Sequence, residues 1–236
     1  MVRTDPSRVG GVVVAAGRGE RLGDGGPKAL ISVGGRALVL HAVDTLRLAG
    51  LETVVVVHPP DAESTFRATL QGHDVLLVPG GATRTDSVRA GIEALAADRE
   101  VVAVHDAARP LVPPEVVVRA VQAVVDGVLA VAPAVRVADT LKRVDGDLVV
   151  ATVDRGALRG VQTPQVFPRW VLDAVLVRAG SATDELSLVE RAIADGRLDG
   201  EVKVVDGSAF GMKVTYPDDL TMLEALARSR DGQEPM

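Results

Sequence analysis

The chain has 236 residues, a formal net charge of −6 and no cysteine. This length suffices for one large α/β domain and is too short for two large domains. The acidic balance argues against a nucleic-acid binder, and the lack of cysteine excludes disulfides, thiolate chemistry and a cysteine-based zinc site. The sequence has no signal peptide and no apolar run long enough to cross a membrane, so we expect a cytoplasmic protein with no membrane partner.

Short valine-rich runs alternate with longer segments of helical composition. Aromatic residues make up only 2% of the chain, and a core of valine and alanine suits strands that are buried on both faces. The repeated units predict an α/β, Rossmann-like three-layer sandwich with a mainly parallel twisted sheet, which binds ligands at the carboxyl ends of its strands. The expected strands are 12–14, 54–57, 75–78, 101–104 and 129–131, and the expected helices are 38–49, 64–70, 87–97 and 115–125.

The pattern changes between residues 133 and 160. Residues 135–143 alternate like a strand, 145–147 (DGD) form a hairpin turn, and 148–153 form the returning strand. A two-stranded ribbon is marginal in water by itself, so we expect a protruding β-arm over about 134–160 that packs on a second subunit.

The whole pattern predicts a single domain over residues 9–228 that includes the arm. Residues 1–8 and 229–236 are polar and carry no periodicity. We expect these two ends to be mobile.

The first expected strand leads into a glycine-rich loop with basic residues, 17–21 (GRGER), followed by Lys28. Glycine lets backbone N–H groups approach an anion, and arginine and lysine balance the charge of a reacting polyphosphate. The loop is no P-loop, because Lys28 precedes Ala29, and no dinucleotide fingerprint, because Gly23 stands one residue too late. An ordinary turn is the alternative, and we favour a triphosphate site.

A second glycine motif, residues 80–88 (GGATRTDSV), follows the strand expected at 75–78. Its glycines can admit a flat base against the backbone, and Ser87 can offer a hydroxyl near a helix N-terminus. The alternative is a turn with an N-cap, which Thr85, Asp86 or Ser87 would supply.

Residues 105–110 (HDAARP) follow the strand expected at 101–104. Asp106 is well placed to hold Mg²⁺ beside a triphosphate, because that ion takes few, hard oxygen ligands from the protein. Arg109 can grip a second phosphate with two hydrogen bonds. The alternative is a surface Asp–Arg pair.

Three motifs lie in the last third of the chain. Residues 162–167 (QTPQVF) follow the arm, and 183–185 (TDE) open a later helix; each is also explained by a turn or a cap. Lys213 precedes a terminal helix expected from Pro217. A lone lysine in an edge strand, as expected here, usually faces solvent.

In order and spacing, these motifs resemble the 2-C-methyl-D-erythritol 4-phosphate cytidylyltransferase family, over about residues 9–226. The matching motifs are AAGxGxR…PK, GGxxRxxSV, HDAARP, QTPQxF, TDE and KVTxPxD. The resemblance implies an enzyme that transfers CMP from CTP to methylerythritol phosphate and releases pyrophosphate, in the non-mevalonate route to isoprenoids. It also implies a homodimer joined through the β-arm.

The resemblance also assigns roles. The catalytic residues are expected to be Arg21, Lys28 and Lys213. The expected nucleotide-binding residues are Ala15, Ala16, Gly17, Gly19, Gly80, Gly81, Ala82, Arg84 and Ser87. The expected substrate-binding residues are Asp106, Arg109, Thr140, Arg155, Thr163 and Thr183. The expected cofactor is Mg²⁺ on Asp106, with Mn²⁺ or Co²⁺ as substitutes.

Three positions depart from the family's pattern, namely Leu22 for Met, Ala82 for an acidic residue of some relatives, and Gly211 for a common Asn. None removes a charged residue assigned to the chemistry. Two alternatives remain open: a ribitol-5-phosphate cytidylyltransferase, and a non-catalytic nucleotide-binding regulator on the same fold. A regulator would be expected to lose charged residues of the site, and all of them are present.

Overall fold

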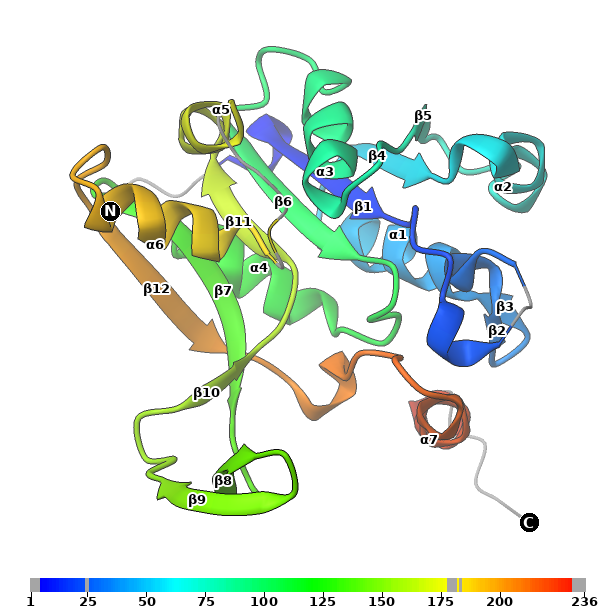
Figure 1. Ribbon diagram of the computed structural model, residues 1–236. Coiled ribbons are helices and arrows are strands. Elements are labelled where there is room, and N and C mark those ends of the chain that lie inside the picture. Colours follow the sequence, from blue (N-terminus) through cyan, green and yellow to red (C-terminus); the bar gives the residue numbers. More distant parts are fainter. Residues whose placement is uncertain (1–4, 24–25, 178–181, 183, 231–236) are drawn as a thin grey trace.

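The computed structural model describes residues 5–23, 26–177, 182 and 184–230 (Figure 1). Its central sheet has eight strands, in the order β10-β7-β11-β6-β1-β4-β5 with β12 beside β7. These strands are β1 (Val9–Val14), β4 (Thr53–His58), β5 (Leu76–Pro79), β6 (Val101–Asp106), β7 (Val128–Arg136), β10 (Arg159–Val161), β11 (Gln165–Pro168) and β12 (Glu201–Asp206). The helices are α1 (Leu38–Leu48), α2 (Glu63–Thr69), α3 (Arg84–Glu93), α4 (Pro114–Gln122), α5 (Arg169–Leu176), α6 (Leu186–Ala194) and α7 (Pro217–Arg230).

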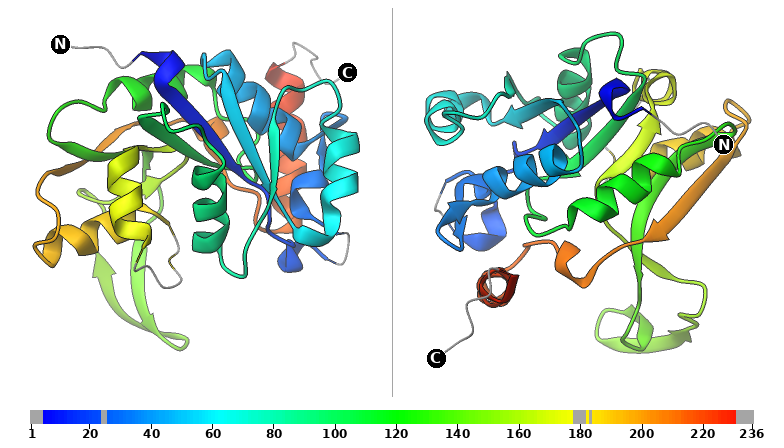
Figure 2. Two further views of the ribbon diagram at one scale, coloured as in Figure 1. Left: turned by 90° about the horizontal axis from the view of Figure 1, so that it is seen from above. Right: turned by 180° about the vertical axis from the view of Figure 1, so that it is seen from behind.

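Helices cover both faces of this sheet, because successive side chains of each strand point to opposite sides. In β4, Val54 and Val56 join a core with α1 and α4, whereas Val55 and Val57 join a core with α3, α5 and α6. Figure 2 shows the resulting three layers. The pairs β1–β4, β1–β6, β4–β5 and β7–β12 are parallel, and β10 and β11 run antiparallel to their neighbours. The predicted α/β three-layer fold is confirmed.

The register brings several strand ends to one edge of the sheet. Val14 of β1 lies beside Asp106 of β6 and Val57 of β4, and His58 lies beside Pro79 of β5. Main-chain bonds continue this alignment into the loops, since Ala107 N donates to Val14 O at 3.1 Å. The motifs that follow these strands are therefore neighbours in space.

Helix α3 begins earlier than the expected 87–97. Thr83 is its N-cap: the Thr83 hydroxyl accepts from Asp86 N at 3.1 Å, and Asp86 Oδ2 accepts from Thr83 N at 3.2 Å. This reciprocal capping box satisfies two N-terminal backbone donors and fixes the start at Arg84. The alternative interpretation, in which Thr85, Asp86 or Ser87 supplies the N-cap, is therefore wrong.

The arm is a separate two-stranded sheet, β8 (Leu141–Asp145) and β9 (Leu148–Val153), that projects from the sandwich (Figure 1). The expected continuous strand 135–143 is wrong, because its two ends have different partners. Arg136 ends β7 and pairs with Arg159 of β10, whereas β8 pairs only with β9. The turn between β8 and β9 is confirmed, with Gly146 at a φ of +53°.

Helix α7 begins at Pro217 as predicted, and the Asp219 carboxylate caps it by accepting from Tyr216 N at 2.8 Å. Residues 6–8 form a short 3₁₀ helix, while 1–4 and 231–236 lie outside the described residues, so the mobility of the two ends stays a prediction. Among the described residues, each helix is too short or too polar to cross a membrane.

Candidate active site

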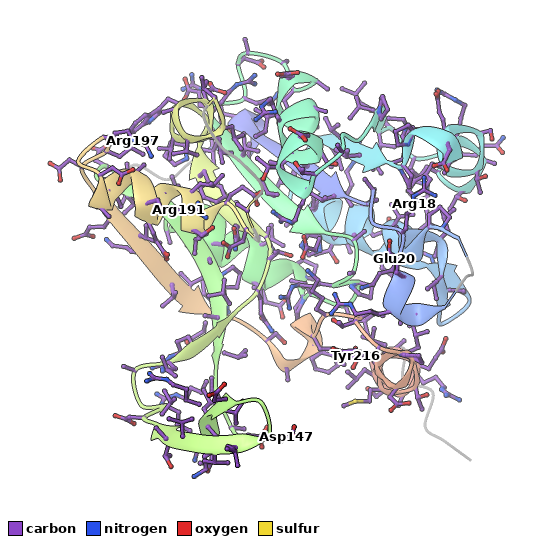
Figure 3. All side chains as sticks on the ribbon, in the orientation of Figure 1. Arg18, Glu20, Asp147, Arg191, Arg197 and Tyr216 are labelled. Carbon is purple, nitrogen blue, oxygen red and sulfur yellow. The ribbon has the colours of Figure 1, made fainter. Side chains whose placement is uncertain are left out.

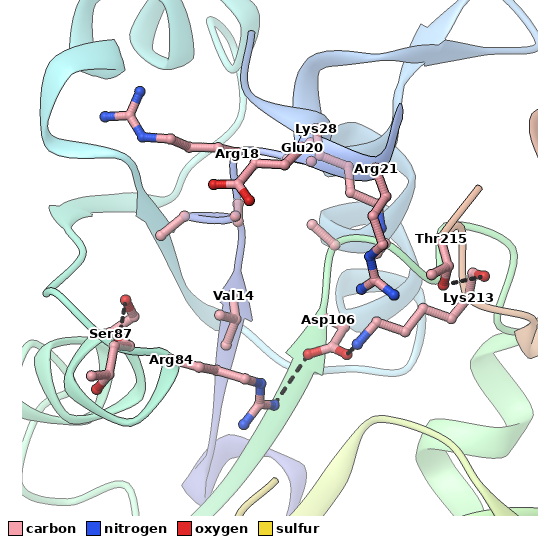
Figure 4. Close-up of a pocket in the computed structure, with 18 of the residues that line it drawn as sticks. Val14, Arg18, Glu20, Arg21, Lys28, Arg84, Ser87, Asp106, Lys213 and Thr215 are labelled. Atoms are coloured by element: carbon pink, nitrogen blue, oxygen red, sulfur yellow. Dashed lines mark hydrogen bonds and ion pairs between the residues drawn. The ribbon is translucent and has the colours of Figure 1, made fainter. Parts of the chain in front are cut away.

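A cleft of about 450 Å³ lies at the strand ends, between the loops after β1, β5 and β6 and the segment 213–215 (Figure 4). Most of the predicted catalytic and nucleotide-binding residues line it, together with the predicted metal and substrate residue Asp106: Ala15, Ala16, Gly17, Gly19, Arg21, Lys28, Gly81, Ala82, Arg84, Ser87 and Lys213. Residues from four distant parts of the chain thus form one cationic cleft.

The glycine loop owes its shape to Gly19, whose φ is +71°. A Cβ at this position would lie 2.8 Å from Lys28 Cβ, so the loop and the lysine pack too closely for any larger residue. The backbone bond from Lys28 N to Gly17 O, at 3.3 Å, closes the loop. Gly19 is needed here both for its conformation and for the space beside Lys28.

We predict that Gly19→Ala lowers the free energy of unfolding of the ligand-free protein by about 1–2 kcal/mol, because alanine is strained at a positive φ. Gly17→Ala is the matched control: its Cβ would meet nothing within 4 Å, so we expect a change within about 0.5 kcal/mol. Denaturant unfolding measures both. Equal losses in the two variants would contradict this explanation of the loop.

The opposite wall of the cleft is the loop after β5. Gly81 N donates to Ser87 Oγ at 3.2 Å, and that hydroxyl donates to Thr83 O at 3.0 Å. A Cβ at Gly81 would lie 2.3 Å from Asp86 Cβ, so the backbone approaches the start of α3 closely. Ser87 therefore holds the loop in shape, and Gly80 lies behind it, with its N–H bonded to His58 O at 2.8 Å.

The Lys28 side chain extends from the glycine loop to the segment 213–215, where its Nζ donates to Val214 O. Burial, together with the neighbouring cations Lys213 and Arg21, lowers the pKa of Lys28 from 10.5 to about 8. The Arg21 Cζ lies 5.6 Å from the centroid of the Tyr216 ring, a cation–π contact, and the Arg21 side chain lines the cleft.

Lys213 lies in a loop, so its placement in an edge strand was wrong. The preceding residues 209–211 form a 3₁₀ turn, after which the chain runs along the cleft. The Lys213 Nζ donates to Asp106 Oδ2 at 2.7 Å, so the side chain extends into the cleft (Figure 4).

Asp106 is buried at the floor of the cleft, and both of its oxygens are paired. Oδ1 accepts from Arg84 Nη2 at 3.1 Å, and Oδ2 accepts from Lys213. Burial alone would raise the pKa of Asp106, but the charges of Arg84 and Lys213 hold it well below its usual range. This carboxylate is ionised at every physiological pH and organises two of the cleft's cations.

The described residues contain no cluster of three metal-ligating side chains. A single carboxylate nevertheless fits Mg²⁺, which commonly binds through one or two carboxylates with substrate phosphates and water as its other ligands. In the cleft, Asp106 can serve in this way, because an ionised carboxylate has about four lone-pair sites and the contacts from Arg84 and Lys213 leave others free. The residues present therefore fit the ion.

Thr163 and Arg109 lie behind the cleft. Thr163 is buried, and its hydroxyl accepts from Asp106 N at 3.1 Å and lies 2.9 Å from His105 Nδ1. Burial lowers the pKa of His105 to about 4, so its ring is neutral. Arg109 donates to the carbonyl oxygens of Gly211 at 2.7 Å and Val161 at 3.2 Å. In this structure both residues form hydrogen bonds with the backbone of segments that surround the cleft. Their roles in substrate binding stay predictions.

The remaining predicted substrate contacts are dispersed. Thr140 and Arg155 are exposed where the chain enters and leaves the β8–β9 hairpin, and they do not line the cleft. Thr183 lies outside the described residues. In Figure 3 the arm, with Asp147 at its turn, lies apart from the loop that bears Arg18 and Glu20.

Sequence reasoning missed several residues of the site. Arg18, Glu20, Thr83 and Thr215 line the cleft, and Glu185 binds Arg84 from behind. Glu185 lies in the TDE motif, which therefore held a signal, although only Thr183 of that motif was assigned a role.

Comparisons with known proteins identify the family of this chain. The model of the family described as IspD, 2-C-methyl-D-erythritol 4-phosphate cytidylyltransferase, matches residues 9–229. A protein of that name from Frankia casuarinae is 48% identical over 221 residues, which are 93% of this chain and 81% of the relative. The one from Streptomyces avermitilis is 43% identical over an alignment of 250 positions, gaps included, which covers 97% of this chain and 96% of the relative.

Solved structures agree. The crystal structure of 2-C-methyl-D-erythritol 4-phosphate cytidylyltransferase from Thermus thermophilus has a TM-score of 0.77 and 36% sequence identity, with 92% of this chain and 98% of that chain covered. That of 4-diphosphocytidyl-2C-methyl-D-erythritol synthase from Anaerococcus prevotii has a TM-score of 0.79 at 28% identity, with 95% and 100% covered. The chain belongs to the 2-C-methyl-D-erythritol 4-phosphate cytidylyltransferase family.

Proposed function

We propose that the protein transfers CMP from CTP to 2-C-methyl-D-erythritol 4-phosphate, giving 4-diphosphocytidyl-2-C-methyl-D-erythritol and pyrophosphate. The observation that carries this proposal is the convergence of Lys28, Lys213 and Arg21 on one cleft beside Asp106. Membership of the family supports the identity of both substrates. These substrates are charged and water-soluble, which supports a cytoplasmic site of action.

The reaction needs one bond to form and one to break. An oxygen of the substrate phosphate attacks the α-phosphorus of CTP in line, and the bond to the β-phosphate breaks, so that pyrophosphate leaves. Such a transfer depends on positioning and charge neutralisation rather than on a covalent enzyme intermediate. Lys28 and Arg21 neutralise the charge that accumulates at the α-phosphate, and Lys213, fixed by Asp106, neutralises the incoming phosphate.

The loop after β5 supports a choice of base. Its backbone around Gly81 is fixed by Ser87 and by the capping box at Thr83, so its donors and acceptors have set positions. When the polar groups of a site all form hydrogen bonds with the edge of one base, some of these groups are left without a partner when another base binds. The other base is therefore rejected. Loop 80–82 is proposed to read the edge of cytosine.

Mg²⁺ is the proposed cofactor, with Mn²⁺ or Co²⁺ as substitutes. When bound, it would shield the triphosphate charge, with Asp106 as its protein ligand. We predict that EDTA abolishes turnover and that added Mg²⁺ restores it, measured as pyrophosphate release. Undiminished turnover in metal-free buffer would contradict the proposal.

The protein is proposed to be a homodimer joined through the β-arm. Leu148 and Val149, neighbours on β9, are 75% and 64% exposed and point to opposite faces of the hairpin. Val150 is 60% exposed as well. A thin ribbon that exposes apolar side chains on both faces is stabilised when a second copy covers it.

We predict that Leu148→Asp/Val149→Asp converts the dimer to a monomer, because each face of the arm then carries a charge. Leu48→Asp is the matched control, since Leu48 is 72% exposed on α1, away from the arm. Sedimentation velocity measures the state of all three proteins. A wild-type monomer, or a variant that still dimerises, would contradict the arm interface.

Two substrate competitions test the proposed function. Initial rates with CTP, UTP, ATP and GTP should favour CTP strongly, and methylerythritol phosphate should be used in preference to ribitol 5-phosphate. Preference for ribitol 5-phosphate would support that alternative enzyme. CTP binding without turnover with either acceptor would support a non-catalytic regulator.

A further inference from the structure

Glu185 is a fully buried charge behind the cleft, with 0% of its surface exposed. Its Oε1 accepts from Arg84 Nη1, and its Oε2 has no hydrogen-bond partner among the described residues. Burial raises the pKa of this carboxyl, and the charge of Arg84 opposes that rise. Burying an unpaired carboxylate costs free energy, and the ion pair with Arg84 offsets this cost for Glu185.

Arg84 is held between two carboxylates. Its Nη1 donates to Glu185, and its Nη2 donates to Asp106 Oδ1 at 3.1 Å. Because a guanidinium is planar and rigid, fixing one of its nitrogens fixes the direction of the other. Glu185 therefore determines how Arg84 meets Asp106.

The segment that carries Glu185 is itself anchored to the site. Thr85 Oγ1, next to Arg84, accepts from Ala182 N at 3.2 Å. Gln165 Oε1, on β11, accepts from Leu186 N at 3.3 Å. Glu185 thus has a fixed position relative to both α3 and the sheet.

The four side chains form a row of alternating charge, Glu185–Arg84–Asp106–Lys213. Without the charge of Glu185, Arg84 would be drawn to Asp106 alone. Arginine favours a two-pronged contact with a carboxylate, so it would then take both Asp106 oxygens. One of those oxygens is the present partner of Lys213.

We propose that Glu185 is a positioning residue: it holds one edge of Arg84, restricts Arg84 to one oxygen of Asp106, and so keeps the other oxygen for Lys213. This inference rests on the proposed function, because Lys213 serves the transfer there. Glu185 itself is not among the residues that line the cleft.

The test compares Glu185→Gln, which keeps the shape and removes the charge, with Glu190→Gln, the same change at an exposed position of α6. We expect Glu185→Gln to lower kcat about 10- to 100-fold, as loss of a partner that orients a functional side chain commonly does, and to raise KM for CTP by a smaller factor, because Arg84 also lines the cleft. Glu190→Gln should match the wild type. In an Arg84→Gln background, Glu185→Gln should lower kcat no further, because its effect passes through Arg84.

A crystal structure of Glu185→Gln gives a readout independent of turnover. We expect Arg84 on both oxygens of Asp106 and Lys213 displaced. If the wild type fails to use CTP and methylerythritol phosphate, the proposed function fails, and this structural comparison still tests the inference. Glu185→Asp serves in the same way if the glutamine variant does not fold, since it shortens the reach to Arg84. Unchanged kcat, equal losses with and without Arg84, or an unmoved Arg84 would overturn the inference.

Discussion

Lys28→Ala is expected to lower kcat about 100- to 1000-fold, equivalent to about 3–4 kcal/mol of transition-state stabilisation. The reason is the position of this ammonium group, which reaches into the cleft between the glycine loop and Val214 beside two further cations. Neither Lys213 nor Arg21 can replace it, since Lys213 is engaged by Asp106 and Arg21 lies over Tyr216.

Turnover with saturating CTP and methylerythritol phosphate measures this loss. Lys203→Ala is the control, because Lys203 makes an exposed ion pair with Glu201 on β12, far from the cleft. It should leave kcat within about threefold, since surface pairs contribute little. Near-normal turnover by Lys28→Ala would remove the residue from the catalytic set.

The low pKa of Lys28 adds a pH signature to this first prediction. A lysine is cationic below its pKa, so the free enzyme loses this charge as the pH rises through about 8. We therefore expect kcat/KM for CTP to decline above that pH. Lys28→Arg should show no decline there, because arginine stays charged. The same decline in both proteins would assign it to another group.

Arg155→Ala is expected to raise KM for methylerythritol phosphate by at least about tenfold while KM for CTP changes little, because an arginine fork engages two phosphate oxygens. In the single chain, Arg155 is exposed just after the hairpin and lies outside the cleft. The arm of a partner subunit would bring this residue to the other subunit's cleft. The prediction thus depends on an active site that is shared between the two subunits of the proposed dimer, with the cleft from one subunit and the arm from the other.

Mixed dimers test the sharing directly. With methylerythritol phosphate well below its KM, where Arg155→Ala is also impaired, Lys28→Ala mixed with Arg155→Ala should recover about a quarter of wild-type activity after exchange, because one site of each mixed dimer then carries neither lesion. Lys28→Ala mixed with Lys213→Ala is the control: both residues line the same subunit's cleft, so no lesion-free site forms. Recovery in the control, or none in the first mixture despite proven exchange, would contradict a shared site.

Much of the site was predictable because its motifs follow buried strands. The valines before Asp106 and before the glycine loop fix two parallel strands, and their register then places Asp106 beside Val14. The glycines and basic residues of the loop after β1 predicted a cationic wall, and Arg21 and Lys28 do line the cleft. Local sequence therefore sufficed to predict which residues form this side of the cleft.

Contacts between distant segments could not be predicted in the same way. Lys213 and Asp106 are 107 residues apart, and Arg84 and Glu185 are 101 apart, so no local pattern reports either pair. The division of 135–143 between β7 and β8 likewise depends on which partner strand each end meets. Such features arise from tertiary packing, which also brings Lys213 to Asp106.

³¹P NMR follows the transfer of CMP from CTP to methylerythritol phosphate directly, because substrates and products all contain phosphorus. With purified protein, CTP, methylerythritol phosphate and Mg²⁺, we expect both substrates to be consumed in equal amounts. One pyrophosphate and one new diphosphate diester should appear for each pair consumed. Pyrophosphate release that does not depend on the acceptor, or no diphosphate product with active-site residues intact, would contradict this transfer.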